Sequence, residues 1–357
     1  MTTSAPSPDL ALFRPEPFEW VDLGYGYLDY CAEGPEGLVL GGWMLRLDGA
    51  FDSYELVVDG KTRRPVEVVE RAALAEFYPH IPDAERGGFV AIVPPDVVTP
   101  GTGASVVVLG MRAGLPAARM GFDYRPPADL PFPPEDVMRR ATGNAATAFW
   151  LATGAKDGGD FHRLVGRWRD PSTIGRLLEW GCGAGRLSRH LIERFDRSEV
   201  FGCDIDHEAA AWSDRHLNGT FVGTETDPPL PYEDGGFDLV VGLSVFTHLT
   251  HDYQERWLAE LERVLAPGGL LLVTTHGTFA ARWLYPNADD LERLFATGFH
   301  DSIRDEGLGK VASGDYYKST FQTEAYTRAF WGRRFDVLEF VEGGCHNLQD
   351  IWLLRRR

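Results

Sequence analysis

The chain has 357 residues, which is enough for about two domains of the usual ~100–200 residues. Apolar side chains make up 44% and charged ones 25%, both typical of globular proteins, so wholesale disorder is excluded. The 53 acidic and 35 basic side chains give a formal net charge of −18, which disfavours a general nucleic-acid binder or a polybasic membrane protein, because both need a positive surface.

Residues 1–17 are rich in proline and serine, and we expect a flexible leader there. This segment has no basic stretch followed by an apolar one, so it does not resemble a secretory signal. No stretch approaches the ~18 consecutive apolar residues of a membrane span. The four cysteines show neither zinc-ligand spacing nor a disulfide framework, so we expect a metal-free, cytoplasmic protein. They are Cys31, Cys182, Cys203 and Cys345.

Residues 18–125 read as β structure with almost no helical periodicity. Short apolar runs alternate with turn pairs such as Asp59-Gly60 and Gly87-Gly88. This pattern predicts a small all-β, sandwich-like domain, and no catalytic constellation stands out in it. The expected strands are Gly37–Leu47, Tyr54–Val58, Val66–Val69, Phe89–Val93 and Ser105–Leu109.

Residues 126–135 are dense in proline and predict a stiff linker, because proline supports neither a sheet ladder nor a helix interior. Beyond it, residues 136–357 alternate between strand-like and helix-like segments, which predicts an α/β domain with a mainly parallel sheet. Seven strands are expected, at Arg176–Trp180, Glu199–Cys203, Thr220–Val222, Phe237–Leu243, Leu270–Thr274, Val337–Val341 and Asp350–Leu354. The helices expected between them are Arg186–Phe195, His207–His216, Asp252–Leu265 and Ala288–Ala296.

The strongest local signal is an apolar strand that runs into Gly181, Gly183 and Gly185 and then into a helix. Glycines allow a tight turn and let a ligand approach the backbone, and the start of a helix offers free N–H groups. A dinucleotide fingerprint would be G-x-G-x-x-G, and the spacing here differs from it. Asp204 follows at the end of the next strand, at the position where a carboxylate accepts the hydroxyls of a ribose. Asp206 fits better as the N-cap of the helix that follows.

Four segments, in this order and spacing, resemble class I S-adenosylmethionine-dependent methyltransferases, a Rossmann-like family with helices on both faces of the sheet. They are Glu179–Arg186, Pro228–Val240, Ser244–Leu249 and Leu261–Gly269. The resemblance implies S-adenosylmethionine as cofactor and S-adenosylhomocysteine as product.

The resemblance also implies roles for individual residues. Asp204 would hold the ribose, Ile205 would cover one adenine face, and Glu225 or Thr226 would contact the adenine edge. Leu243 and Ser244 would lie under the cofactor, next to the glycine loop of Gly181, Gly183 and Gly185. Glu179 would lie near the amino group of the methionine moiety.

Methyl transfer is an in-line substitution that depends mainly on alignment, although a hydroxyl acceptor usually needs a base. His276 follows the fifth strand at the ligand-binding edge and is our first choice for that base, while a loop histidine without a catalytic role is about as consistent with the pattern. His248 is the second candidate, through contact more than proton transfer. The aromatic-rich connection 278–335 and the segment Arg140–Asn144 are expected to line an acceptor pocket.

The function expected is methylation of a small hydroxylated or amino acceptor, and in particular O-methylation of a sugar, a glycan or a natural product. The alternative is a non-catalytic scaffold that binds the cofactor and interacts through the β domain. A nicotinamide dehydrogenase is disfavoured by the glycine spacing. The β domain could bind a glycan, dock a partner or form a homo-oligomer, and the sequence does not choose among these roles.

Overall fold

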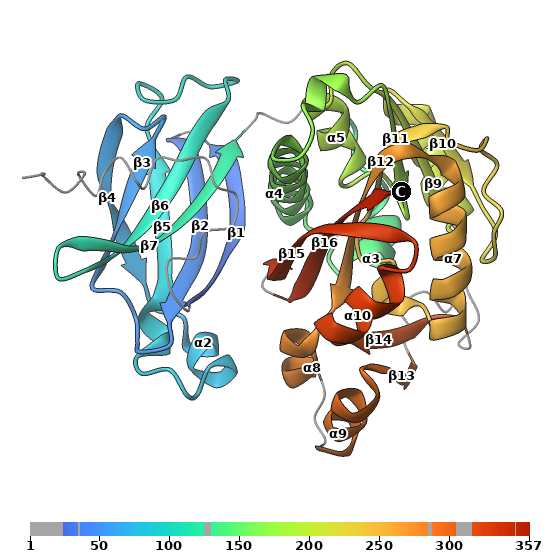
Figure 1. Ribbon diagram of the computed structural model, residues 1–357. Helices are drawn as coiled ribbons and strands as arrows, with labels where there is room; N and C mark the ends of the chain where they lie inside the picture. The colour runs from blue at the N-terminus through green and yellow to red at the C-terminus, as the bar shows by residue number, and fades with distance from the viewer. Residues whose placement is uncertain (1–23, 35, 125–129, 285–287, 305–315, 347) are drawn as a thin grey trace, which may run out of the picture. The chain divides into compact units, whose positions relative to one another are not determined.

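The computed structural model describes residues 24–34, 36–124, 130–284, 288–304, 316–346 and 348–357. The expected leader at 1–17 and the start of the expected linker, residues 126–129, lie outside this part of the chain. The described residues form two compact units (Figure 1). The first contains the residues from Gly24 to Tyr124 together with Leu151–Arg163, and the second contains the rest.

The first unit is a seven-stranded sheet in which every neighbouring pair is antiparallel, in the order β1-β2-β5-β4-β3-β6-β7. Strand β4 pairs with β5 on one side and with β3 on the other, and the apolar faces of both halves share one core. The strands are β1 (Gly24–Gly34), β2 (Gly37–Arg46), β3 (Ser53–Val58), β4 (Thr62–Val69), β5 (Gly88–Val93), β6 (Ala104–Arg112) and β7 (Leu115–Tyr124). The expected all-β, sandwich-like architecture is confirmed.

The first unit also contains features that the sequence pattern did not indicate. Strands β1 and β7 were not predicted, since glycines interrupt the first and alanines with a proline dilute the second. A short helix, α2 (Ala72–Phe77), lies between β4 and β5. The expected turn at Asp59-Gly60 lies in the three-residue connection between β3 and β4, and its two residues have positive φ, +48° and +66°.

The second unit contains the expected Rossmann-like α/β sheet. All seven predicted strands are present, and five of them form the parallel run β10-β9-β8-β11-β12. These are β8 (Arg176–Trp180), β9 (Glu199–Asp204), β10 (Thr220–Gly223), β11 (Phe237–Gly242) and β12 (Leu265–His276). Antiparallel β16 (Gln349–Arg356) pairs with β12, and β15 (Phe335–Cys345) pairs with β16.

The sheet has nine strands where the sequence predicted seven. The two further strands, β13 (Phe299–Arg304) and β14 (Lys318–Gln322), form a hairpin-like pair that joins the carboxyl end of β12 where His276 pairs with Phe321. Both strands are short and polar, so their sequences show no clear alternation.

Helices cover the sheet because each buries one apolar stripe. In α7 (His251–Val264) the buried residues Trp257, Leu258, Leu261 and Val264 recur at helical spacing and pack into the main core together with α10 (Glu324–Trp331). A separate cluster joins α3 (Glu135–Thr142) to α6 (His207–His216). The other helices are α4 (Thr147–Gly166), α5 (Ser188–Arg194), α8 (Thr278–Leu284) and α9 (Ala288–Thr297).

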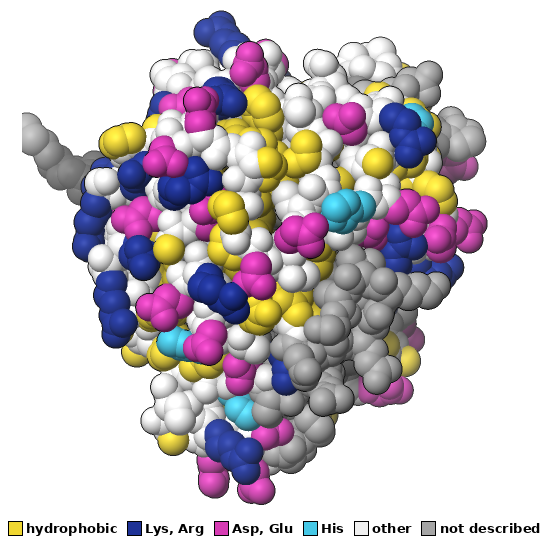
Figure 2. Space-filling model, turned by 90° about the vertical axis from the view of Figure 1, so that its right-hand side faces the viewer, with side chains coloured by type: hydrophobic (Ala, Val, Ile, Leu, Met, Phe, Trp, Pro, Cys, Tyr) yellow, Lys and Arg dark blue, Asp and Glu magenta, His cyan; other side chains and the backbone are white. Residues whose placement is uncertain are grey.

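Charged side chains of both signs occur on the surface. Acidic and basic side chains are interspersed on the face shown in Figure 2, and among its described side chains there is no broad basic patch of the kind that a nucleic acid would need. Within the described residues, the helices are too short or too polar to cross a membrane.

Candidate active site

The glycine loop that follows β8 adopts the conformation that the sequence pattern predicts. Gly181, Gly183 and Gly185 have φ of +80°, +49° and +76°, in the left-handed region that favours glycine. A Cβ atom on Gly181 would come within 2.4 Å of a Val245 methyl group, and one on Gly185 within 2.2 Å of a Leu217 methyl group. Close packing therefore explains the first and third glycines.

The middle glycine has room for a Cβ atom. A Cβ atom on Gly183 would approach nothing closer than the Ala141 Cβ, at 3.7 Å. The Gly183 backbone N–H donates to Oδ2 of Asp204 at 2.6 Å, while the Gly183 carbonyl accepts from the Ser213 hydroxyl at 3.1 Å. The loop is thus fixed to β9 and α6 and leaves room on its outer side for a bound molecule.

Asp204 ends β9 with its carboxylate turned back toward the glycine loop. Its Oδ1 accepts from the backbone N–H of Asp206 at 2.7 Å, and its Oδ2 accepts the Gly183 bond. Burial raises the pKa of Asp204 to about 6, even though these two backbone donors favour the charged form. A carboxylate with this raised pKa is poised to accept hydrogen bonds from a ligand hydroxyl.

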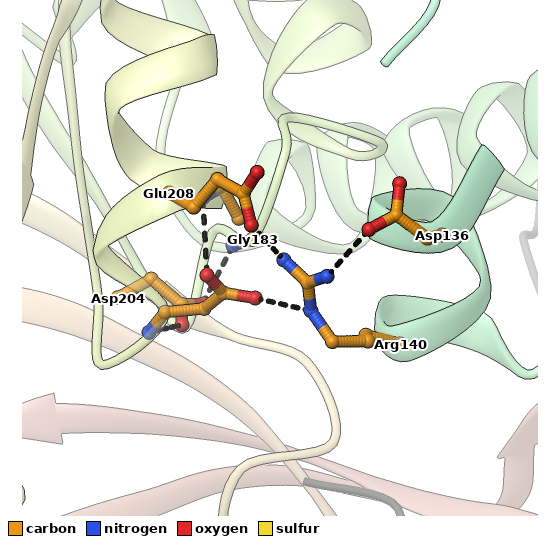
Figure 3. Close-up of polar contacts among 7 residues, drawn as sticks. Asp136, Arg140, Gly183, Asp204 and Glu208 are labelled. Atoms are coloured by element: carbon orange, nitrogen blue, oxygen red, sulfur yellow. Dashed lines mark hydrogen bonds and ion pairs between the residues drawn. The ribbon is translucent and has the colours of Figure 1, made fainter. Parts of the chain in front are cut away.

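Asp206 is the N-cap of α6, as the sequence predicts, and accepts from the Ala209 backbone N–H at 3.1 Å. Arg140, on α3, binds the other carboxylate oxygen (Figure 3). The guanidinium Nε lies 3.0 Å from Oδ2 of Asp206, and Nη2 lies 2.7 Å from Glu208. Its remaining nitrogen, Nη1, lies 3.0 Å from Asp136 within α3 itself.

These elements surround a cavity at the carboxyl ends of β8, β9 and β11, where open α/β sheets bind their ligands. Among the described residues, eight of the predicted site residues line it: Glu179, Gly181, Gly183, Asp204, Ile205, Leu243, Ser244 and His248. Arg140, Ala141, Tyr316 and Tyr317, which were expected around an acceptor pocket, line the same cavity.

Four of the predicted site residues are not in the lining: Gly185, Glu225, Thr226 and His276. Gly185 packs against Leu217, as described above. At the expected adenine position the cavity is lined by Thr224, whose backbone N–H donates to the Asp204 carbonyl at 2.8 Å. The pairing of Gly223 with Asp204 places the chain one to two residues earlier than the sequence suggested.

Glu179 lies near the end of β8 and is buried, with 3% of its surface exposed. Its Oε2 accepts a short hydrogen bond from the Ser188 hydroxyl on α5. The carboxylate is therefore at the cavity wall and is held by the helix that follows the glycine loop.

Ser244 adopts an unusual backbone conformation directly after β11, with φ of +61°. Its N–H donates to the Thr274 hydroxyl at 2.8 Å, and its own hydroxyl accepts from the Gln349 side-chain amide at 2.9 Å. Thr274 in turn donates to Gln349 at 2.6 Å. This uncharged network joins β11, β12 and β16 and supports the strained residue.

His248 lines the cavity and stacks on Tyr317, with ring centroids 4.0 Å apart and planes 12° apart. His276 lies behind it, with a centroid distance of 6.3 Å between the two imidazoles, and stacks on Phe321. Burial, together with the neighbouring His248, lowers the pKa of His276 to about 3. His276 is therefore neutral at ordinary pH, and it is not among the residues that line the cavity.

Two cysteines, Cys182 and Cys203, also line the cavity. Both are free and buried, and burial together with the charge of Asp204 raises the pKa of each thiol well above its ordinary value. The sequence analysis gave them no role beyond the absence of a disulfide pattern.

Sequence reasoning also missed Asp206 and Trp257 as lining residues, and it did not foresee what Arg140 contacts. Arg140 lies on a helix that precedes the sheet, and the acidic residues Asp206 and Glu208 lie at the start of α6. This combination could have indicated an ion pair. No sequence rule places those segments side by side.

Part of the chain is similar to known proteins. Residues 178–273 match a family model described as a methyltransferase domain. Relatives include malonyl-[acyl-carrier protein] O-methyltransferase from Geobacter sulfurreducens, 35% identical over 105 residues that cover 29% of this chain and 39% of the relative. Tocopherol O-methyltransferase from Arabidopsis thaliana is 33% identical over 110 residues, which cover 29% and 30% of the two chains. Demethylmenaquinone methyltransferase from Thermus thermophilus is 38% identical over 102 residues, which cover 28% and 46%.

The chain thus spans less than half the length of each of these relatives. Among solved structures, a S-adenosylmethionine-dependent methyltransferase from Methanosarcina mazei aligns with a TM-score of 0.41 at 20% identity. The alignment covers 54% of this chain and 96% of that one.

Proposed function

Because the C-terminal part of the chain contains a class I S-adenosylmethionine-dependent methyltransferase domain, we propose that the protein transfers a methyl group from this cofactor to a small hydroxylated or amino acceptor. The observation that carries the proposal is the cavity itself, in which the glycine loop, the carboxylate of Asp204 and an aromatic wall meet. When bound, the cofactor supplies an electrophilic methyl group on a sulfonium.

The residues present fit such a cofactor. The open side of Gly183 admits a ligand against the backbone, and the Asp204 carboxylate is positioned to accept two ribose hydroxyls. Ile205 covers an adenine face in this arrangement, with Thr224 beside it in place of Glu225 or Thr226. Glu179 faces the ammonium of the methionine moiety, since an opposite charge favours that position.

The residues after β11 and those before β14 line the side of the cavity that we assign to the acceptor. This part of the described lining holds His248, Trp257, Tyr316 and Tyr317 and contains neither a carboxylate nor a lysine or arginine. An uncharged, aromatic wall favours an acceptor without a phosphate or carboxylate at the reacting end. Relatives named for tocopherol, demethylmenaquinone and ajmaline methylation support a ring-bearing natural product more than a sugar or a glycan.

We assign the acceptor contact to His248, since it lies in the cavity wall. His276 then acts behind it, in support of the His248 ring, because a buried imidazole with a pKa of about 3 is a weak base. The domain boundaries at 18–125, 126–135 and 136–357, a cytoplasmic location and docking or dimerisation through the β domain remain part of the proposal.

The proposal is tested by titrating the full chain with S-adenosylhomocysteine in a calorimeter. We would then measure methyl transfer from tritiated S-adenosylmethionine to a panel of phenols, quinols, amines and sugars. Cofactor binding together with methyl transfer supports an enzyme. Cofactor binding without transfer to any acceptor class supports the scaffold alternative. Absence of cofactor binding would contradict both.

Asp204→Asn is expected to weaken S-adenosylhomocysteine binding by about 1–3 kcal/mol, through loss of charge-assisted hydrogen bonds to the ribose. In the unsubstituted protein the affinity should fall as the pH drops through about 6, because protonation removes the acceptor charge. The variant should lack this pH dependence. The matched control is Glu225→Gln, which lies beside the lining and should leave the affinity unchanged within about twofold. An unaltered affinity in Asp204→Asn would refute the ribose assignment.

A further inference from the structure

Helix α3 lies over the cavity. Ala141, one residue after Arg140, lines the cavity and provides the atom closest to the open side of Gly183. On the same face of the helix, Val137 and Met138 are buried in the cluster that contains Cys182, Ala209 and Trp212. The helix therefore closes the side of the cavity at which the glycine loop is open.

The carboxyl half of α3 is attached to α6 through one side chain. Arg140 is 16% exposed and uses Nε and Nη2 to bind Asp206 and Glu208, the N-cap and an early residue of α6 (Figure 3). Its partner within α3, Asp136, is 71% exposed. The attachment to α6 thus combines one part-buried ion pair, with Asp206, and one at the surface, with Glu208.

Helix α3 ends at a glycine. Its C-cap is Gly143, with φ of +71°, and the Gly143 N–H closes the helix on the Arg139 carbonyl at 2.8 Å. Upstream, Arg189 on α5 holds the Pro131 carbonyl at 3.0 Å and lies over the Trp150 ring. The segment is therefore anchored before and after α3, while the helix itself is held down by two apolar side chains and Arg140.

We infer that Arg140 is a latch that holds α3 closed over the cofactor, so that cofactor exchange requires its ion pairs with Asp206 and Glu208 to break. This inference rests on the proposed cofactor binding. Arg140 is a positioning residue: it acts through Asp206, which lies beside the ribose-binding Asp204, and through Ala141, which covers the loop.

The test measures dissociation of S-adenosylhomocysteine from the full chain by stopped-flow fluorescence. Arg140→Met should raise the dissociation rate roughly tenfold, because the two charge-assisted contacts with Asp206 and Glu208 are lost. Arg139→Met, the exposed arginine next to it on the same helix, should change the rate less than about twofold. Glu208→Gln should give an intermediate rate, and Arg140→Lys should restore part of the retention.

Salt separates a latch from a general packing effect. Added salt should speed dissociation from the unsubstituted protein, since the Arg140–Glu208 pair between the helices lies at the surface, and should change little in Arg140→Met. Hydrogen exchange at the Met138 and Gly143 amides should be slowed by S-adenosylhomocysteine and accelerated by Arg140→Met. The Gln254 amide in α7 serves as the internal control.

An unchanged dissociation rate in a folded Arg140→Met protein, or an equal rise in Arg139→Met, would overturn the latch. If Arg140→Met proves unstable in a melting experiment, Glu208→Gln alone decides, because it keeps the Asp206 pair. If the unsubstituted protein binds no S-adenosylhomocysteine, the proposed function fails instead. Unaltered exchange at α3 in Arg140→Met would then reject the latch independently.

Discussion

Two aspartates, Asp204 and Asp206, lie two positions apart and do different things. The backbone turn between them directs one carboxylate to the glycine loop and the other to the start of α6 and to Arg140. Sequence position alone could assign the N-cap to Asp206, because helix N-caps have a local signature. The Arg140 partner could not be assigned, since it comes from a segment 66 residues earlier in the chain.

At the same scale, the two histidines differ in burial and not in sequence context. His248→Asn is expected to lower the transfer rate at saturating cofactor by roughly 10²-fold and to leave S-adenosylhomocysteine affinity unchanged. His276→Gln should have the smaller effect on rate. Because its pKa is lowered to about 3, His276 carries no charge above about pH 5. Its loss should therefore leave unchanged any fall in the transfer rate that occurs near pH 6. The measurement is a pH–rate profile with the best acceptor from the tritium assay. A larger loss in His276→Gln would return the base role to it.

At the scale of elements, the strand-loop-helix unit from β8 to α5 was predictable almost completely. Three glycines after an apolar strand specify a turn, and the structure gives all three a positive φ. What the sequence does not reveal is which glycine serves packing and which serves a ligand. Only the neighbours Val245, Leu217 and Ala141, from three other segments, make that distinction.

This difference leads to opposite expectations for two single substitutions. Gly185→Ala should destabilise the protein by about 1–2 kcal/mol or more, from the left-handed backbone plus the overlap with Leu217. Gly183→Ala should carry the backbone cost alone and weaken S-adenosylhomocysteine binding beyond what its stability loss explains, because the new methyl group points into the cavity. Chemical denaturation and calorimetric titration of both variants decide this. Similar binding losses in the two would contradict the packing assignment.

Elsewhere among the elements, long periodic segments were predicted and short polar ones were not. Helix α6 has the bounds that the sequence gave, and β8 does as well. Strands β13 and β14 were missed because a five- or six-residue polar strand pairs through its backbone and needs no apolar pattern. Strand register also bears on which residue after β10 reaches the cavity, and Thr224 is in the lining while Glu225 and Thr226 are not.

At the scale of the whole molecule, two hydrophobic cores are built from separate residues, one around Tyr54 and Phe89 and one around Trp257 and Val240. The charge of −18 is spread over both and therefore says more about solubility than about a ligand. The proposed binding of the methyl donor depends on a few acidic residues at the carboxyl edge of the sheet in the C-terminal unit.

A ligand that binds one unit should stabilise that unit. At a hundredfold excess over its dissociation constant, S-adenosylhomocysteine is expected to add about 2.7 kcal/mol to the stability of the C-terminal unit. Differential scanning calorimetry with and without the ligand should show the shift in the transition of that unit only. Equal shifts of all transitions would mean that the chain unfolds as one cooperative body.

The sulfur atoms of Cys182 and Cys203 in the cavity wall acquire a significance beyond packing once a methyl donor is considered. A sulfonium alkylates any good nucleophile held near it, and a thiolate is among the best that a protein offers. Burial and the neighbouring Asp204 charge keep both sulfur atoms in the thiol form. The wall expected to receive the donor therefore holds both sulfur atoms in their less nucleophilic form.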